Sequence, residues 1–160
     1  MKFSVSLSDF PKFNANVIDK GELLKLCGQE VANTNVRLVR NAAQGVGADG
    51  QPIKPGGYSP SYLKAMKAGS VKGRNGVAKP YTETVNLRIS GELLNSMQQR
   101  KGGDGKSAEL FINGVDNQIV ASSLFAKGFN HWFEFGKPDL ARITNAFDAF
   151  VKRATAKILR

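Results

Sequence analysis

The 160-residue sequence has little of the chemistry on which many small enzymes and secreted domains depend. It contains a single cysteine, Cys27, and a single histidine, His131. One cysteine excludes an intramolecular disulfide and any zinc site built on a C-x-x-C pair. No stretch approaches the ~20 apolar residues of a membrane span, and the first residues lack the continuous apolar run of a signal peptide. We therefore expect a soluble protein that is made in a reducing compartment.

Acidic residues are also scarce, with 13 Asp and Glu against 23 Lys and Arg, so the chain carries a net charge of +10. The acids never form the close, repeated cluster that a two-metal nuclease uses. A strongly basic chain favours a polyanion or an acidic protein as its partner. Charge alone does not distinguish these two partners.

Apolar side chains are plentiful enough for one globular core. Hydrophobic residues make up 41% of the chain, and ten of them are phenylalanine. This length suits one ordinary core and is too short for two. We expect a single domain over residues 1–160, within which residues 44–81 form a flexible basic excursion.

Strands are predicted where polar and apolar residues alternate. Residues 1–13 and 107–112 show this pattern, and residues 82–89 have β-branched, extended character. Asn113-Gly114 is typical of a hairpin turn, so we expect residues 118–121 to return beside 107–112 as an antiparallel partner.

Helices are predicted where apolar residues recur every three or four positions. Two long helices, over residues 20–43 and 138–159, enclose shorter ones at 60–68 and 91–101. Asp19 and Ser59 stand at N-cap positions of the first and second of these. The fold class that follows is α+β, with a small antiparallel sheet packed by a long N-terminal and a long C-terminal helix, and with a long flexible basic loop.

The excursion is the most unusual feature of the sequence. Residues 50–82 contain six basic residues and no acid. These cations either make a solvated loop or form an arm that neutralises phosphates without reading sequence. The six, predicted to face DNA or a neighbouring ring, are Lys54, Lys64, Lys67, Lys72, Arg74 and Lys79.

Aromatic residues gather beside the excursion and before the last helix. Tyr58 and Tyr62 either stack on bases or tie the excursion to the body. Four rings fall within seven residues between 129 and 135, and they cannot all face inward from so short a segment. At least one is therefore expected at a subunit contact. The predicted contact residues are Tyr58, Tyr62, Phe129, Trp132, Phe133 and Phe135.

Motifs of catalysis and cofactor binding are weak here. Gly105-Lys106-Ser107 lacks the earlier glycine of a phosphate-binding loop, because Arg100 holds that position. Cys27 lies on a helical apolar stripe, where a buried thiol is ordinary. His131 with Glu134 is the one acid–base pair to consider. We expect no catalytic residues, no cofactor and no metal, with an enzyme centred on His131 and Glu134 as a minor alternative.

Three blocks give the chain a resemblance to a known family. They read YSPSYxxxMK at residues 58–67, NLxxSGELLxSM at 86–97 and WFxFGxxDxxxI at 132–143. In this order, after a long first helix and before a terminal helix, they resemble tailed-phage virion-morphogenesis proteins, which include the Mu-like tail-completion family and related neck proteins. The likeness spans roughly residues 20–160. Asn130-His131 stand where that family often has an arginine-proline pair.

The resemblance implies a non-enzymatic structural protein of the phage neck, active in tail completion and head–tail joining. Such a subunit would be made in the host bacterial cytoplasm and reside in the virion. It would assemble as a homo-oligomeric ring, commonly a hexamer, around DNA that passes without sequence recognition. Its neighbours would be tail-terminator or tail-tube proteins and head-closure or connector proteins, with no membrane partner. The alternative from charge alone is a sequence-independent nucleic-acid-binding accessory protein.

Overall fold

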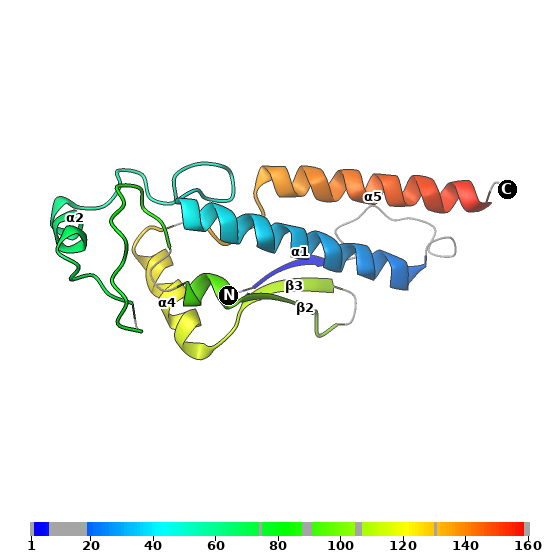
Figure 1. Cartoon of the computed structure of the whole chain (residues 1–160). Coiled ribbons are helices and arrows are strands. Elements are labelled where there is room, and N and C mark those ends of the chain that lie inside the picture. Colours follow the sequence, from blue (N-terminus) through cyan, green and yellow to red (C-terminus); the bar gives the residue numbers. More distant parts are fainter. Residues whose placement is uncertain are drawn as a thin grey trace.

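The computed structural model describes residues 2–6, 19–73, 75–87, 91–104, 107–129 and 131–158. They form an elongated α+β molecule in which a small antiparallel sheet packs against long first and last helices, as the sequence predicts (Figure 1). The elements in order are β1 (Lys2–Ser6), α1 (Lys20–Gln44), α2 (Pro60–Lys67), α3 (Glu92–Asn95), β2 (Met97–Lys101), β3 (Ser107–Ile112), α4 (Val115–Ala126) and α5 (Lys137–Ile158).

Helix α1 is the central layer, with the sheet on one side and α5 on the other (Figure 1). It begins where predicted, because the Asp19 carboxylate accepts hydrogen bonds from the backbone N–H groups of Gly21 (2.7 Å) and Glu22 (3.3 Å). It ends at Gly45, whose φ of 80° is left-handed. A side chain there would collide with the carbonyl of Val85, so only glycine fits. The predicted apolar stripe is buried, at Leu23, Cys27, Val31, Leu38 and Ala42.

The sheet has the order β1-β3-β2, and both pairings are antiparallel. Its central strand β3 turns Ala108, Leu110 and Ile112 into the core against α1. On the opposite face, Glu109 is held by Arg100 of β2 at 3.0 Å. Strands were predicted within residues 1–13 and at 107–112; residues 2–6 and 107–112 form β1 and β3, while residues 1 and 7–13 lie outside the described residues. The partners that pair with β3 were not predicted.

The helix predicted over residues 91–101 is wrong beyond its first turn. Helix α3 stops at Asn95, and Met97–Lys101 form β2 instead. The Ser96 hydroxyl donates to the Leu93 carbonyl (2.7 Å), while the Ser96 carbonyl accepts from the Asn113 N–H (2.8 Å). Pairing with β3 thus replaces the next helical turn, so tertiary context overrides local propensity.

The hairpin predicted from residues 107–112 to 118–121 is also wrong. Gly114, with φ 84°, leads directly into α4. Gln118 donates from its side-chain amide to the Ile112 carbonyl (2.9 Å), and Asn117 donates in the same way to the Asn113 carbonyl (3.1 Å). These bonds fold the helix back onto the strand end. The extended segment predicted at 82–89 likewise has no strand over its described residues, 82–87.

Helix α5 follows its predicted range and packs along α1 (Figure 1). Ile143, Phe147 and Phe150 are buried, and the last two form a small cluster with Leu23 near the start of α1. Leu140 is spaced three residues before Ile143, so the sequence pattern places it on the same apolar stripe, but it is 54% exposed. The stripe therefore begins one turn later than the sequence pattern indicates.

Candidate functional site: the arm and the pocket at its base

Residues 45–81, here called the arm, extend from the end of α1 past the end of the sheet (Figure 1). The arm has structure of its own. Helix α2 begins where predicted, because the Ser59 hydroxyl accepts from the Tyr62 N–H (3.3 Å). A turn follows in which the Lys79 N–H donates to the Val71 carbonyl (2.8 Å) and the Gly73 N–H to the Val77 carbonyl (2.9 Å).

The arm is fastened to the body at Asn86. The Tyr58 hydroxyl donates to the Asn86 carbonyl (2.9 Å) and accepts from the Asn86 N–H (3.1 Å). Tyr62 stacks on Tyr58 with ring centroids 4.7 Å apart. Buried Ile53 joins the main core. Tyr58 therefore ties the arm down, which was one of the two roles considered for the tyrosines.

Lys79 does not face outward as predicted. Its side chain is buried, and its ammonium donates to the Asn86 side-chain carbonyl oxygen (2.6 Å) and backbone carbonyl (3.2 Å). The ammonium also lies 5.6 Å from the centroid of the Tyr58 ring. Burial lowers the pKa of Lys79 to about 8. Lys79 is thus part of the fastening at Asn86 and is not a cation presented to DNA or to a neighbouring ring.

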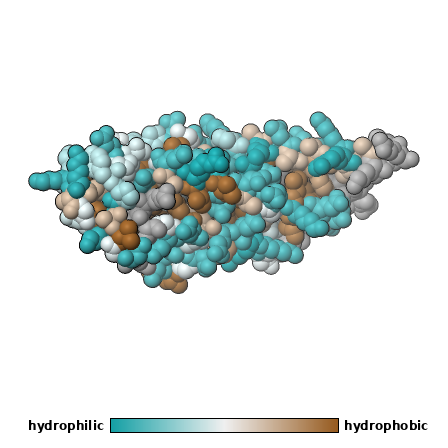
Figure 2. Space-filling model, in the orientation of Figure 1, coloured by the Kyte–Doolittle hydropathy of each residue, from teal (hydrophilic) through white to brown (hydrophobic). Residues whose placement is uncertain are grey.

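The other predicted cations are distributed over the arm surface. Lys64, Lys67 and Lys72 are exposed, and the ammonium of Lys67 lies 4.8 Å from the Tyr81 ring centroid. Lys54 is half-buried, with its ammonium 4.9 Å from the centroid of Phe129. In Figure 2 the tip at the arm end is hydrophilic, with smaller hydrophobic patches beside it. Arg74 lies outside the described residues.

A pocket of about 480 Å³, here called the arm pocket, opens between the arm and helices α3 and α4. Its aliphatic and aromatic wall comes from both sides of this junction and includes Tyr58, Tyr62, Leu93, Leu124 and Phe129. Four lysines also line it, namely Lys54, Lys72, Lys79 and Lys127, while Glu92 is the one acid among its described lining residues. This combination of apolar wall and excess positive charge suits an anionic, partly apolar group.

The aromatic segment before α5 divides between core and surface. Trp132 and Phe133 are fully buried, with ring centroids 5.6 Å apart. The prediction that these two make a subunit contact is wrong for this fold, because the core already covers both rings. Phe129 and Phe135 are partly buried and keep exposed surface. They are the two rings of this segment that remain accessible to a neighbour.

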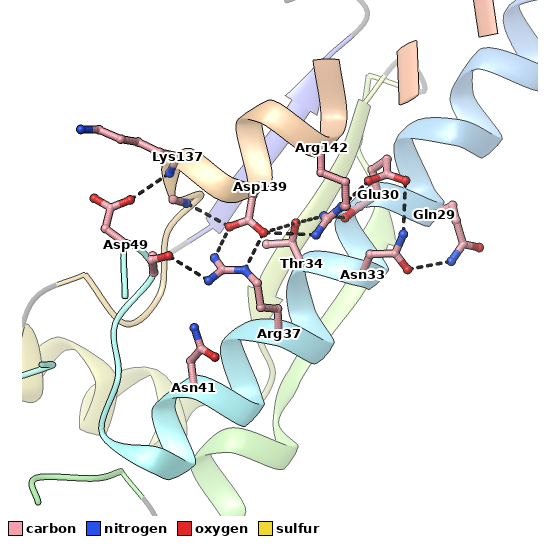
Figure 3. Close-up of polar contacts among 12 residues, drawn as sticks. Gln29, Glu30, Asn33, Thr34, Arg37, Asn41, Asp49, Lys137, Asp139 and Arg142 are labelled. Atoms are coloured by element: carbon pink, nitrogen blue, oxygen red, sulfur yellow. Dashed lines mark hydrogen bonds and ion pairs between the residues drawn. The ribbon is translucent and has the colours of Figure 1, made fainter. Parts of the chain in front are cut away.

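A buried polar network, here called the lock, joins α1 to the start of α5 (Figure 3). Asp139 is fully buried, and its carboxylate accepts hydrogen bonds from two of the guanidinium nitrogens of Arg37, Nε (2.7 Å) and Nη2. Arg142 donates from Nε to the Glu30 carboxylate (2.6 Å) and from Nη2 to the Thr34 hydroxyl (2.8 Å). Two-point Arg–carboxylate pairing fixes relative orientation.

The lock also holds the base of the arm. Arg37 donates from Nη1 to the Ala48 carbonyl (2.8 Å), and the Asp139 carboxylate accepts from the Gly136 N–H (3.0 Å). Gly136 fits against Ala48 so closely that a side chain would collide with the Ala48 carbonyl. The Phe-Gly-x-x-Asp part of the third sequence block is therefore the junction of arm, α1 and α5.

The lock was not predicted from the sequence, although the sequence contains one indication of it. The apolar stripe of α1 steps from Val31 to Leu38, and polar Thr34 fills the position between them. A polar residue on the buried face of a helix needs a hydrogen-bonding partner. Glu30 and Arg37, on either side of it, indicated charges on the same face.

His131 and Glu134, the minor catalytic candidates, do contact one another. The imidazole Nδ1 lies 2.5 Å from the Glu134 carboxylate, and the His131 side chain is 66% exposed. His131 has a φ of 62°, and its carbonyl accepts from the Ala48 N–H at 2.5 Å. Its backbone therefore supports the arm base, and neither residue is among the described lining of the arm pocket.

Comparison with protein-family models, with curated proteins and with solved structures found no match. Within the described ranges, no three His, Cys, Asp or Glu side chains gather in a way that would hold a metal ion. Over the same part of the chain, no helix combines the length and apolarity needed to cross a membrane.

Proposed function

We propose that this chain is a non-enzymatic structural protein of a tailed-phage neck, which completes the tail and joins it to the head. It would act as one subunit of a homo-oligomeric ring, commonly six-fold, around the DNA path. Tail-terminator or tail-tube proteins would lie on one side of the ring and head-closure or connector proteins on the other.

The observation that carries this proposal is the way in which the arm is presented. It extends beyond the sheet, yet it is fixed at Asn86 and at the lock, so exposed lysines and an open pocket are held at one end of an elongated molecule. A ring needs such a surface, because heterologous contacts join different faces of successive subunits. A preorganised surface also binds with less loss of entropy than a mobile loop.

Two of the three sequence blocks that carry the family resemblance hold the arm in this position. Asn86 of the second block fastens the arm, and Leu87 and Leu93 of the same block are buried in the core. Gly136 and Asp139 of the third block build the lock. Residues of these two blocks therefore help to orient the arm.

Electron microscopy of particles made without this chain tests the proposal. We expect separate filled heads and tails, and restoration of joined virions when the chain is supplied from a plasmid. Normally joined, infectious virions in its absence would overturn the proposal.

A sequence-independent nucleic-acid-binding role is the second candidate, favoured by the net charge of +10 and by exposed Lys64, Lys67 and Lys72. Duplex binding measured against salt tests it, because log K falls with log[salt] at a slope of about −0.9 per phosphate contacted. A flat or absent response would remove this candidate.

A further inference from the structure

The arm pocket has an apolar interior formed by two separate parts of the chain. Leu93 of α3, with Val120 and Leu124 of α4, lines one side, and Tyr58 and Tyr62 of the arm line the other. The volume of about 480 Å³ lies in the roughly 300–1,000 Å³ range of sites that enclose a ligand. Such a space has room for apolar side chains of a partner.

Positive charge surrounds this apolar interior. Lys72 of the arm and Lys127 after α4 both line the pocket, and both side chains are exposed. Half-buried Lys54 also lines it, whereas Glu92 is the one acid in the described lining. A partner with carboxylates beside its apolar residue would complement this arrangement, and such complementarity gives specificity and speeds association.

A nucleic acid fits the pocket less well than a peptide does. Base stacking needs free aromatic faces, but Tyr58 and Tyr62 already stack on one another, and the Tyr58 hydroxyl is bonded to Asn86. The aliphatic side chains of Leu93, Val120 and Leu124 offer no polar readout of a base edge. These features favour the side chain of a leucine, methionine or phenylalanine.

From these contacts we propose that the arm pocket binds an acidic peptide segment of another protein. One apolar side chain of that segment enters between α4 and the tyrosine pair, and flanking carboxylates meet Lys54, Lys72 and Lys127. This inference rests on the docking role proposed above and names the chemistry of the partner at that site.

An array of hexapeptides probed with the full chain tests the inference. The two central positions carry every pair of amino acids, the four flanking positions carry Asp and Glu, and a second array carries Asn and Gln there instead. We expect enrichment of apolar centres with acidic flanks, and a loss of affinity of about tenfold or more with neutral flanks. No enriched peptide, or enrichment independent of either the flanks or the centre, overturns the inference.

Variants locate the binding. The double variant Lys72→Glu, Lys127→Glu should lower the affinity for the best peptide about tenfold or more. The control is the double variant Lys25→Glu, Lys152→Glu, which makes the same charge change at exposed positions away from the pocket. Its affinity should change less than about twofold. Leu124→Ala should weaken it about threefold or more, because apolar contact is lost. Equal effects of the two charge-reversal pairs would overturn the assignment to the arm pocket.

A single-stranded oligonucleotide of mixed sequence is the competing probe. If it displaces the best peptide and is weakened selectively by the pocket variants, the site is a nucleic-acid site and the peptide inference fails. Peptide binding with normal joining of virions that lack the chain would retain the pocket and reject the neck function. Separated heads and tails in the absence of the chain, together with no peptide binding, would retain the neck function and reject the peptide site.

Discussion

Charged side chains occupy two regions of this molecule, the lock between α1 and α5 and the arm beyond the end of α1, and their surroundings differ. In the lock, acids and arginines are paired: Asp139 with Arg37 and Glu30 with Arg142. On the arm surface, Lys64, Lys67 and Lys72 are exposed in a stretch of sequence that has no acid between residues 50 and 82. Paired charges fix the geometry within the chain, whereas an excess of one sign is available to a partner.

Lys79 shares features with both regions. It belongs to the basic stretch by sequence, but its ammonium is buried against Asn86 and Tyr58. It therefore resembles the lock in its role, because it holds the arm in place. The arm is thus divided into cations that fasten it and cations that face outward.

The largest effect in this comparison is expected for Asp139→Ala. The change leaves Arg37 and Arg142 without the carboxylate that they share, and breaking a buried pair typically costs about 3–5 kcal/mol. Urea denaturation measures the free energy of unfolding. Asp148→Ala, at an exposed position of the same helix, is the control and should change stability by less than about 0.5 kcal/mol. Similar losses for both variants would show that the lock has no special role.

Gly136→Ala should have the next largest effect. The added methyl group would collide with the Ala48 carbonyl at the base of the arm, so the backbone must shift, at a cost of about 1–3 kcal/mol. Gly28→Ala is the matched control, because α1 leaves open space there. That control should be stabilised by up to about 1 kcal/mol, since alanine favours a helix over glycine. Destabilisation of Gly28→Ala to the same extent would contradict the close approach at Gly136.

The pH dependence of stability should report the burial of Lys79. Its pKa is about 8 in the folded protein and near 10.5 when unfolded, so between these values the unfolded chain binds more protons. The folded protein therefore gains stability as pH rises through this window.

Relative to Lys79→Met, the native chain should gain about 2 kcal/mol of unfolding free energy between pH 7 and pH 10. Denaturant titrations of both proteins at several pH values give this difference, and the paired comparison cancels other groups that titrate in the same range. Parallel pH profiles would mean that Lys79 is solvated.

The smallest effect on stability is expected for the exposed arm lysines. Lys64→Glu, Lys67→Glu and Lys72→Glu should each change the free energy of unfolding by no more than about 0.5 kcal/mol. Thermal unfolding checks this directly. A loss comparable to that of Gly136→Ala would place these side chains among the fastenings of the arm.

Local patterns predicted the long elements well. The Asp19 and Ser59 caps and the apolar stripes of α1 and α5 place helices correctly, because these signals are contained within each element. They failed at residues 96–101 and 113–121, where β2 exists only because β3 lies beside it and α4 begins at a glycine that also fits a hairpin.

The site was only partly accessible from the sequence. A basic arm could be recognised from composition, whereas the burial of Lys79 depends on its contacts with Asn86 and Tyr58. The lock depends on residues about 100 positions apart, such as Arg37 and Asp139. The periodicity of apolar residues within one helix or strand does not predict a contact between residues so far apart in the sequence. The arm pocket likewise exists only because α4 folds back beside the arm.

The proposed neck function requires the arm to be a fixed docking surface, and complementation of particles that lack the chain tests this most directly. The triple variant Lys64→Glu, Lys67→Glu and Lys72→Glu is supplied, and joined virions are counted by electron microscopy. We expect a folded protein that leaves heads and tails separate. Joined, infectious virions at the level given by the native chain would show that the exposed lysines of the arm are not a docking surface.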